Sequence, residues 1–255
     1  MMRNFELKYF LEEKYRQYNT PDFILSDPIQ IPHRYSQKED IEISAFLTAS
    51  IAWGNRKMII RNAENIMRIM GNRPYDFLME NDDTDFEEIP HFVHRTFNRT
   101  DLIFFFKSLK NIYQNHGGLE NVFSKYPTDV KKTLSHFREV FFSIPHPDRT
   151  SKHISNTAKN SSAKRLNMFL MWMVRNDKRG VHFGIWNKIP TSALKIPLDV
   201  HVGNTARSLG LLTRKQNDWA SVEELTNNLK EFDKNDPVKF DFALFGLGVF
   251  EGFGR

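Results

Sequence analysis

The chain has 255 residues, with 36 Lys and Arg against 31 Asp and Glu, so its formal net charge is +5. Hydrophobic residues make up 40% and charged residues 26%, a composition that excludes a wholly disordered chain. Cysteine is absent, which excludes disulfides, iron–sulfur clusters, thiolate zinc sites and cysteine nucleophiles. The 23 phenylalanines predict a core rich in aromatic rings.

No segment approaches the roughly 18 to 20 consecutive apolar residues that a membrane-spanning helix needs. Residues 1–8 alternate charged and apolar side chains and lack the apolar stretch of a signal peptide. We therefore expect a soluble, cytoplasmic protein without a membrane partner. The small excess of positive charge permits a polyanionic partner but does not require one.

Amphipathic helical periodicity dominates the sequence. Residues 46–52 are apolar nearly all round, as in a helix at the centre of a domain. Apolar residues recur at three- and four-residue spacing in five further segments, 59–70, 102–113, 166–174, 222–232 and 240–247. Only residues 91–97 favour an extended conformation. The sequence thus predicts an all-α fold, with helices expected to start at Ser161 or Ser162, at Ser221 and at Asp236-Pro237.

Two helix starts carry side chains suited to chemistry. A polar loop leads to Lys164 and Arg165, two cations in the first turn of a predicted helix, where they oppose the helix dipole. The free N–H groups of such a turn attract phosphate. Asp199 follows an extended segment fixed by Pro197 and precedes an apolar helix face. Asp199 is a good N-cap, and this role alone is enough to explain it, just as Lys164 can be an ordinary solvated lysine.

The order of these features resembles the helix-hairpin-helix (HhH-GPD) DNA glycosylase superfamily. In that superfamily a lysine begins a helix after a hairpin, and an aspartate lies in a Val-Asp-x-His-Val-type segment with an arginine further on. Lys164 matches the lysine, Asp199 the aspartate and Arg207 the arginine. The spacing of 35 residues between Lys164 and Asp199 is most similar to the archaeal 8-oxoguanine glycosylase branch. The chain also resembles a bacterial family of uncharacterised proteins that share its Trp-Met-Val-Arg and Pro-Leu-Asp-x-His segments.

The resemblance spans roughly residues 40–250 and implies a fold. We expect a two-layer helical, glycosylase-like domain with a cleft between its subdomains. Residues 37–195 would form a central helical bundle with a hairpin-like segment. Residues 1–36 and 196–255 would form the second subdomain of one compact, monomeric unit.

The resemblance also implies a function, base-excision repair of damaged double-stranded DNA without a cofactor. Lys164, made neutral by desolvation, would attack the sugar and form a Schiff base, and Asp199 would stabilise the positive charge that develops. The resemblance places three residues in a base pocket, Trp53, Trp172 and His201. It places six residues against DNA, namely Asn55, Arg56, Lys159, Ser161, Ser162 and Arg165.

One departure from the superfamily keeps other functions open. Its hairpin usually has a Gly-hydrophobic-Gly turn that binds phosphate, whereas residues 155–163 contain no glycine. A nucleic-acid-binding protein that keeps the scaffold without the chemistry is therefore one alternative. A metal-dependent hydrolase is another, using Asp199, His201 and His182, or His91 and His94.

Overall fold

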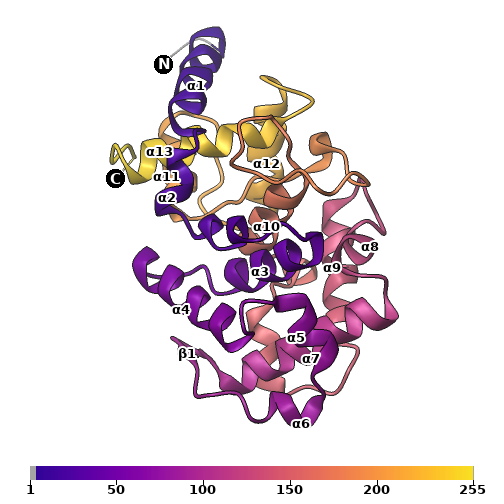
Figure 1. Ribbon diagram of the computed structural model, residues 1–255. Helices are drawn as coiled ribbons and strands as arrows, with labels where there is room; N and C mark the ends of the chain where they lie inside the picture. Colours follow the sequence, from indigo (N-terminus) through magenta and orange to yellow (C-terminus); the bar gives the residue numbers. More distant parts are fainter. Residues whose placement is uncertain (1–3, 255) are drawn as a thin grey trace. The chain divides into compact units, whose positions relative to one another are not determined.

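The computed structural model describes residues 4–254, and its regular secondary structure is almost entirely helical (Figure 1). Residues 1–3, part of the segment used to predict the absence of a signal peptide, lie outside the described residues. Within the described residues the only sheet is an antiparallel hairpin of β1 (Val93–His94) and β2 (Phe97–Asn98), which overlaps residues 91–97, the segment predicted to be extended. The predicted all-α fold is confirmed. No helix among residues 4–254 has the length and apolar character to cross a membrane.

The chain divides into two compact units. We call residues 24–155 the central unit, and residues 1–23 together with 156–255 the terminal unit. The sequence also predicts a central unit and a second unit made of the two ends of the chain, but it places the central bundle at residues 37–195 instead of 24–155. The difference arises because residues 156–195 pack with the C-terminal helices of the terminal unit, as described below. The glycosylase-like layering with a cleft stays a prediction.

The central unit consists of helices and one hairpin around an aromatic core. Phe46 is buried, and its ring centroid lies 6.0 Å from that of Phe105, 5.4 Å from Phe137 and 5.6 Å from Phe141. The prediction of an aromatic-rich core is confirmed. Helix α2 (Asp22–Ser26) spans the unit boundary. The helical segments that follow are η1 (Pro28–Gln30), η2 (Pro32–Arg34), α3 (Lys38–Ser50), α4 (Arg56–Ile69), α5 (Pro74–Glu80), α6 (Asp83–Phe86), α7 (Arg99–Asn115), α8 (Leu119–Phe123), α9 (Val130–Phe141) and η3 (Asp148–His153).

The terminal unit packs the first helix of the chain against the last. Figure 1 shows α1 and α11 close to α13. A Cβ atom on Gly246 would lie 2.2 Å from the Tyr18 ring, and one on Gly248 would lie 2.8 Å from the Thr205 hydroxyl. Glycine therefore permits both close helix contacts. The helical segments are α1 (Asn4–Tyr18), η4 (Thr157–Lys159), α10 (Lys164–Val174), η5 (Thr191–Ala193), α11 (Val200–Ser208), α12 (Trp219–Lys230), η6 (Pro237–Phe240) and α13 (Asp241–Val249).

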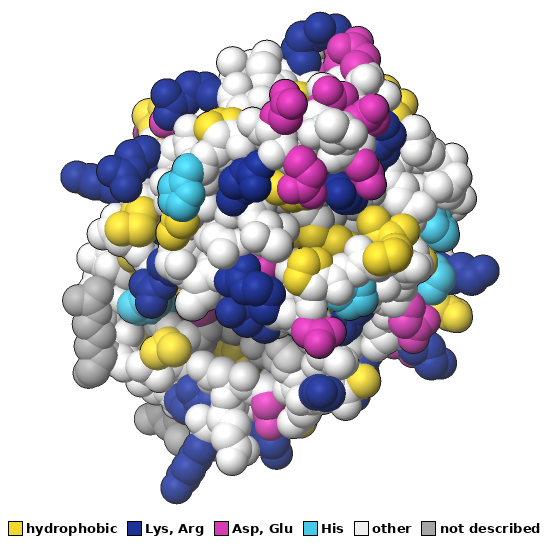
Figure 2. All heavy atoms as spheres, turned by 90° about the horizontal axis from the view of Figure 1, so that it is seen from below, with side chains coloured by type: hydrophobic (Ala, Val, Ile, Leu, Met, Phe, Trp, Pro, Cys, Tyr) yellow, Lys and Arg dark blue, Asp and Glu magenta, His cyan; other side chains and the backbone are white. Residues whose placement is uncertain are grey.

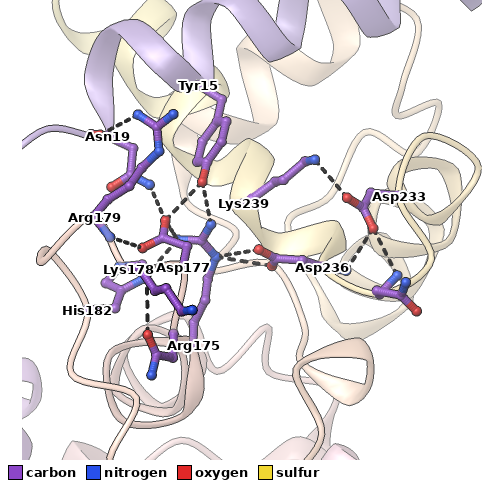
Figure 3. A network of polar contacts seen from close by, with 12 residues as sticks. Tyr15, Asn19, Arg175, Asp177, Lys178, Arg179, His182, Asp233, Asp236 and Lys239 are labelled. Carbon is purple, nitrogen blue, oxygen red and sulfur yellow. Dashed lines mark hydrogen bonds and ion pairs between the residues drawn. The ribbon is translucent and has the colours of Figure 1, made fainter.

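A buried arginine anchors the end of α10 within the terminal unit (Figure 3). Arg175 is 1% exposed and donates to the Tyr15 hydroxyl at 2.9 Å. Its guanidinium also pairs with Asp177 at 2.9 Å and Asp236 at 2.8 Å. Because a buried charge is costly without such partners, these bonds tie the C-terminal end of α10 to α1 and to the segment before η6.

The same network shifts the titration of one carboxylate. Burial by itself raises the pKa of Asp177, but the charge of Arg175 and hydrogen bonds from Arg179, Tyr15 and Asn19 outweigh it and bring the pKa down from 3.8 to about 2. Asp177 is therefore held ionised in the folded protein at neutral pH.

Two predicted helix starts are wrong by a few residues. Helix α10 begins at Lys164 after Ala163, which has φ 49°, and the Ser161 hydroxyl accepts a hydrogen bond from the Ala163 N–H at 3.2 Å. Helix α12 is capped by Asp218, whose carboxylate accepts from the Ser221 N–H at 3.0 Å. Ser161 and Ser221 thus form hydrogen bonds close to a helix start, but neither is the N-cap. The N-cap is Ala163 for α10 and Asp218 for α12.

Asp236-Pro237 opens a 3-10 turn, η6, and the final α-helix follows it from Asp241. Pro237 occupies the first position, where its missing N–H is not needed. The Asp236 side chain does not cap this turn, because Arg175 engages both of its carboxylate oxygens.

Candidate active site

Lys164 is the first residue of α10, and the turn before it directs the helix. Ala163 adopts a left-handed conformation, and no side chain caps the helix start. The Asn167 side chain, one turn into the helix, donates to the Ser162 carbonyl at 3.0 Å. This bond closes the turn from inside and fixes where α10 begins.

Asp199 is the N-cap of α11, as the sequence predicts. One carboxylate oxygen, Oδ1, accepts from the Val202 N–H at 3.0 Å. The other, Oδ2, lies 3.8 Å from the Lys164 amine. A single carboxylate thus caps a helix and faces a lysine at the same time.

The lysine and the aspartate form a partly exposed pair. Their side chains are 26% and 24% exposed, and the Lys164 amine also lies 3.7 Å from the Met168 sulfur. An ammonium and a carboxylate at this separation attract each other, and the remaining exposure leaves room for a third group to approach both. The predicted convergence of these two residues is thus seen in the terminal unit, on the starts of α10 and α11.

Four of the predicted DNA contacts are close to Lys164 in the chain, in or just after residues 155–163. Lys159 is exposed at the end of η4, whereas Ser161 and Ser162 are half-buried and bonded within the turn. Arg165 is also half-buried, and burial lowers its pKa to about 10, so it keeps its charge at neutral pH. Lys159 is the most accessible cation of this set.

Residues 155–163, the segment predicted to be hairpin-like, turn without glycine. Asn160 has φ 63° and Ala163 has φ 49°, so two residues other than glycine occupy the left-handed region. After glycine, asparagine is among the residues that best tolerate this conformation, so Asn160 is a turn signal in a segment without glycine. Asn156 supports the turn by accepting from the Ala158 N–H at 3.0 Å.

The remaining predicted DNA contacts belong to the central unit. Asn55 is exposed and caps α4 by accepting from the Met58 N–H at 3.2 Å, and Arg56 is the first residue of that helix. Asn55 therefore has a structural role whether or not it contacts DNA.

The three predicted base-pocket residues differ in burial. Trp172, on α10, is only 3% exposed and presents almost no surface, whereas His201 is exposed near the start of α11. Trp53 lies in the central unit, where its ring is half-buried, edge-on to His94 at 4.9 Å and roughly parallel to His153 at 6.1 Å. Of the three, Trp172 matches a packing residue, and Trp53 and His201 offer surface to a ligand.

Two of the four histidines considered for a metal site, His182 and His94, have other partners. The ring of His182 lies 3.3 Å from the Arg175 guanidinium, and His94 contacts the Asn62 amide at 2.8 Å. Within residues 4–254, no three His, Asp or Glu side chains are grouped so that they could hold a metal ion. The metal-dependent hydrolase thus has no ligand set in the described part of the chain.

Charge on one face of the molecule is mixed. On the face drawn in Figure 2, Lys and Arg side chains are interspersed with Asp and Glu side chains and do not form one continuous basic field. The net charge of +5 agrees with this pattern.

A family model described as "Protein of unknown function (DUF2400)" matches residues 27–250. The chain belongs to this family. The DUF2400 match includes the central unit almost entirely, and it includes both Lys164 and Asp199. No curated protein and no solved structure matches the chain.

Proposed function

We propose that the protein is a DNA base-excision glycosylase that also cleaves abasic sites through a Schiff base on Lys164. The observation that carries the proposal is the 3.8 Å separation between the Lys164 amine and the Asp199 carboxylate, at the starts of α10 and α11. These are the two residues that match the lysine and the aspartate of the helix-hairpin-helix glycosylases. The substrate would be damaged duplex DNA, and the reaction would need no cofactor.

The pair supplies the two groups that this reaction needs. The Lys164 ammonium first releases a proton to water. The resulting amine forms a bond to the sugar C1′ as the bond from C1′ to the base breaks, and the departing base takes the proton that the attacking nitrogen gives up. Asp199 stabilises the positive charge that develops on the sugar. Opening of the sugar ring then gives a Schiff base, and loss of a C2′ proton eliminates the 3′ phosphate and cuts the strand. Sodium borohydride reduces the Schiff base to a stable amine.

The neighbouring groups suit a DNA substrate. The first N–H groups of α10 have no capping side chain, and Lys159 is exposed one turn before them. Backbone N–H groups at a helix start and a nearby lysine are common phosphate partners. A base lifted out of the duplex would bring its sugar within reach of Lys164.

The second candidate is a nucleic-acid-binding protein without chemistry. It is favoured by the turn of residues 155–163. The Ser161 and Asn156 side chains already form hydrogen bonds within this turn, and no glycine exposes its backbone to phosphate. This candidate predicts DNA binding that weakens with salt and does not depend on the charge pair.

Borohydride trapping separates the two candidates. Duplexes carrying an abasic site, 8-oxoguanine, uracil or an alkylated base are incubated with the protein and borohydride, and covalent adducts are resolved on a denaturing gel. We expect an adduct with the wild type and none with Lys164→Gln. The matched control is Lys234→Gln, which removes an exposed lysine to which the proposal gives no role and should leave the adduct intact. An adduct that survives Lys164→Gln, or no adduct with any duplex, contradicts the proposal.

A further inference from the structure

Two adjacent residues before α12, Asn217 and Asp218, each bind one of the two segments that carry the candidate pair. Asn217 bonds to Asp199, and Asp218 bonds to the turn that precedes Lys164. Both contacts lie within the terminal unit. They connect two sites that are 35 residues apart along the direct path of the chain.

Asn217 fixes the backbone of Asp199. Its side-chain Nδ2 donates to the Asp199 carbonyl oxygen at 3.2 Å, and its Oδ1 accepts from the Arg207 guanidinium at 2.7 Å. A Cβ atom on Gly203 would lie 2.7 Å from Asn217 Oδ1, so a side chain there would push the amide away. The amide is thus bonded to Asp199 and Arg207, and Gly203 leaves room for it. It holds the residue whose carboxylate faces the lysine.

Asp218 fixes the turn of residues 155–163, which precedes Lys164. Its carboxylate accepts from the Asn160 side chain at 3.0 Å, and Asp218 pairs with Ser161 in an antiparallel bridge. The next N–H, that of Trp219, donates to the Asn160 carbonyl at 3.1 Å. The same carboxylate caps α12 through Ser221. The turn of residues 155–163 is therefore bound to the start of α12, and the bridge at Ser161 lies only three residues before Lys164.

We propose that Asn217 and Asp218 are positioning residues that set the distance between the Lys164 amine and the Asp199 carboxylate. Consecutive Cα atoms are about 3.8 Å apart, so this dipeptide is a short link between the two helix starts. The inference rests on the proposed function, because the distance matters only where the two groups act together. A misplacement of the reacting groups by about 1 Å can lower the rate about 100-fold, so a link that fixes their separation affects catalysis directly.

Two substitutions remove one contact each while preserving the local backbone. Asn217→Asp keeps the oxygen that accepts from Arg207 and loses the donor to Asp199. Asn160→Gly loses the donor to Asp218 and suits the left-handed conformation of this exposed residue, with φ 63°. The matched control is Asn228→Ala, because Asn228 donates to the Leu211 carbonyl at 2.8 Å and steadies the same loop away from the pair.

The readout is the single-turnover rate of strand cleavage at an abasic site, measured beside the dissociation constant for the same duplex. We expect Asn217→Asp and Asn160→Gly to lower the rate about 10- to 100-fold with little change in the dissociation constant. Asn228→Ala should match the wild type in both. This split between rate and binding is not expected of a residue that only stabilises the fold.

The outcomes distinguish the inference from the function it rests on. If the wild type cleaves the duplex and both variants cleave at the wild-type rate, the positioning role is overturned and the function stands. The positioning role is also overturned if Asn228→Ala loses as much rate as the other two variants. If the wild type does not react at all, the proposed function and the positioning role fail together.

Discussion

The Oδ2 atom of Asp199 lies 3.8 Å from the Lys164 amine while its Oδ1 atom caps α11 through the Val202 N–H. The carboxylate thus has a structural contact and a chemical contact on different oxygens. Substitutions that affect one contact and spare the other separate these roles.

We expect Asp199→Asn to keep the fold and lose the chemistry. Asparagine caps helices as well as aspartate does, so the free energy of unfolding should stay close to that of the wild type. The rate of abasic-site cleavage should fall about 100-fold, because the negative charge beside the sugar is gone. Asp199→Ala is the comparison and should also lose about 1 kcal/mol of stability. Equal cleavage by Asp199→Asn and the wild type would exclude an electrostatic role.

The buried arginine at the end of α10 predicts a large loss of stability. Arg175→Met leaves Asp177 and Asp236 without their cation, and breaking a buried pair in this way costs about 3 to 5 kcal/mol. Arg34→Met is the matched control, because Arg34 is 44% exposed beside Glu64, where an ion pair contributes about 0 to 1 kcal/mol. Urea unfolding followed by circular dichroism measures both. Similar losses in the two variants would contradict the role of Arg175 as an anchor.

Asp177 predicts a specific dependence of stability on acid pH. Its pKa is about 2 in the folded protein against 3.8 ordinarily, so its contribution is complete above about pH 4 and is lost as pH falls toward 2. Asp177→Asn lacks the ionisable group. The stability difference between wild type and variant should therefore be largest above pH 4 and shrink below it. Thermal unfolding across this range measures the difference, and a constant value would be inconsistent with the assigned pKa.

The contact between α1 and α13 predicts an unusual response to Gly246→Ala. Replacing glycine by alanine inside a helix ordinarily stabilises it by about 0.5 to 1 kcal/mol. Here the added methyl would lie 2.2 Å from the Tyr18 ring, so we expect a loss of about 1 to 3 kcal/mol. Tyr18→Ala should relieve the clash, so that Gly246→Ala costs less in that background. A double-mutant cycle measures this coupling, and additive effects would argue against direct contact.

Local signals in the sequence were enough to predict most helices and the cap at Asp199. In the central unit the apolar spacing predicted α3, α4 and α7, whereas α5, α8 and α9 were not predicted. In the terminal unit the Pro197 segment placed Asp199 before an apolar helix face. The cap at Asp82, whose carboxylate accepts from the Thr84 and Asp85 N–H groups, carries an equally local signal that was missed. Capping is decided within a few residues, which is why it can be read from sequence.

Contacts between distant segments could not be read in this way. Arg175 lies in a recognised segment, Trp-Met-Val-Arg, yet nothing local shows that it is buried against Tyr15 and Asp236, 160 and 61 residues away. The links from Asn217 to Asp199 and from Asp218 to Asn160 depend in the same way on how the helices pack. The pairing of Lys164 with Asp199 was predicted from the resemblance to a known family and not from periodicity or spacing.

The most direct test of the proposed chemistry is to locate the reduced adduct on the chain. Wild-type protein is trapped with borohydride on a duplex containing an abasic site, digested, and mapped by peptide mass spectrometry. The account predicts a deoxyribose remnant on Lys164 and on no other lysine. A remnant spread over several surface lysines, or absent from Lys164, would contradict it.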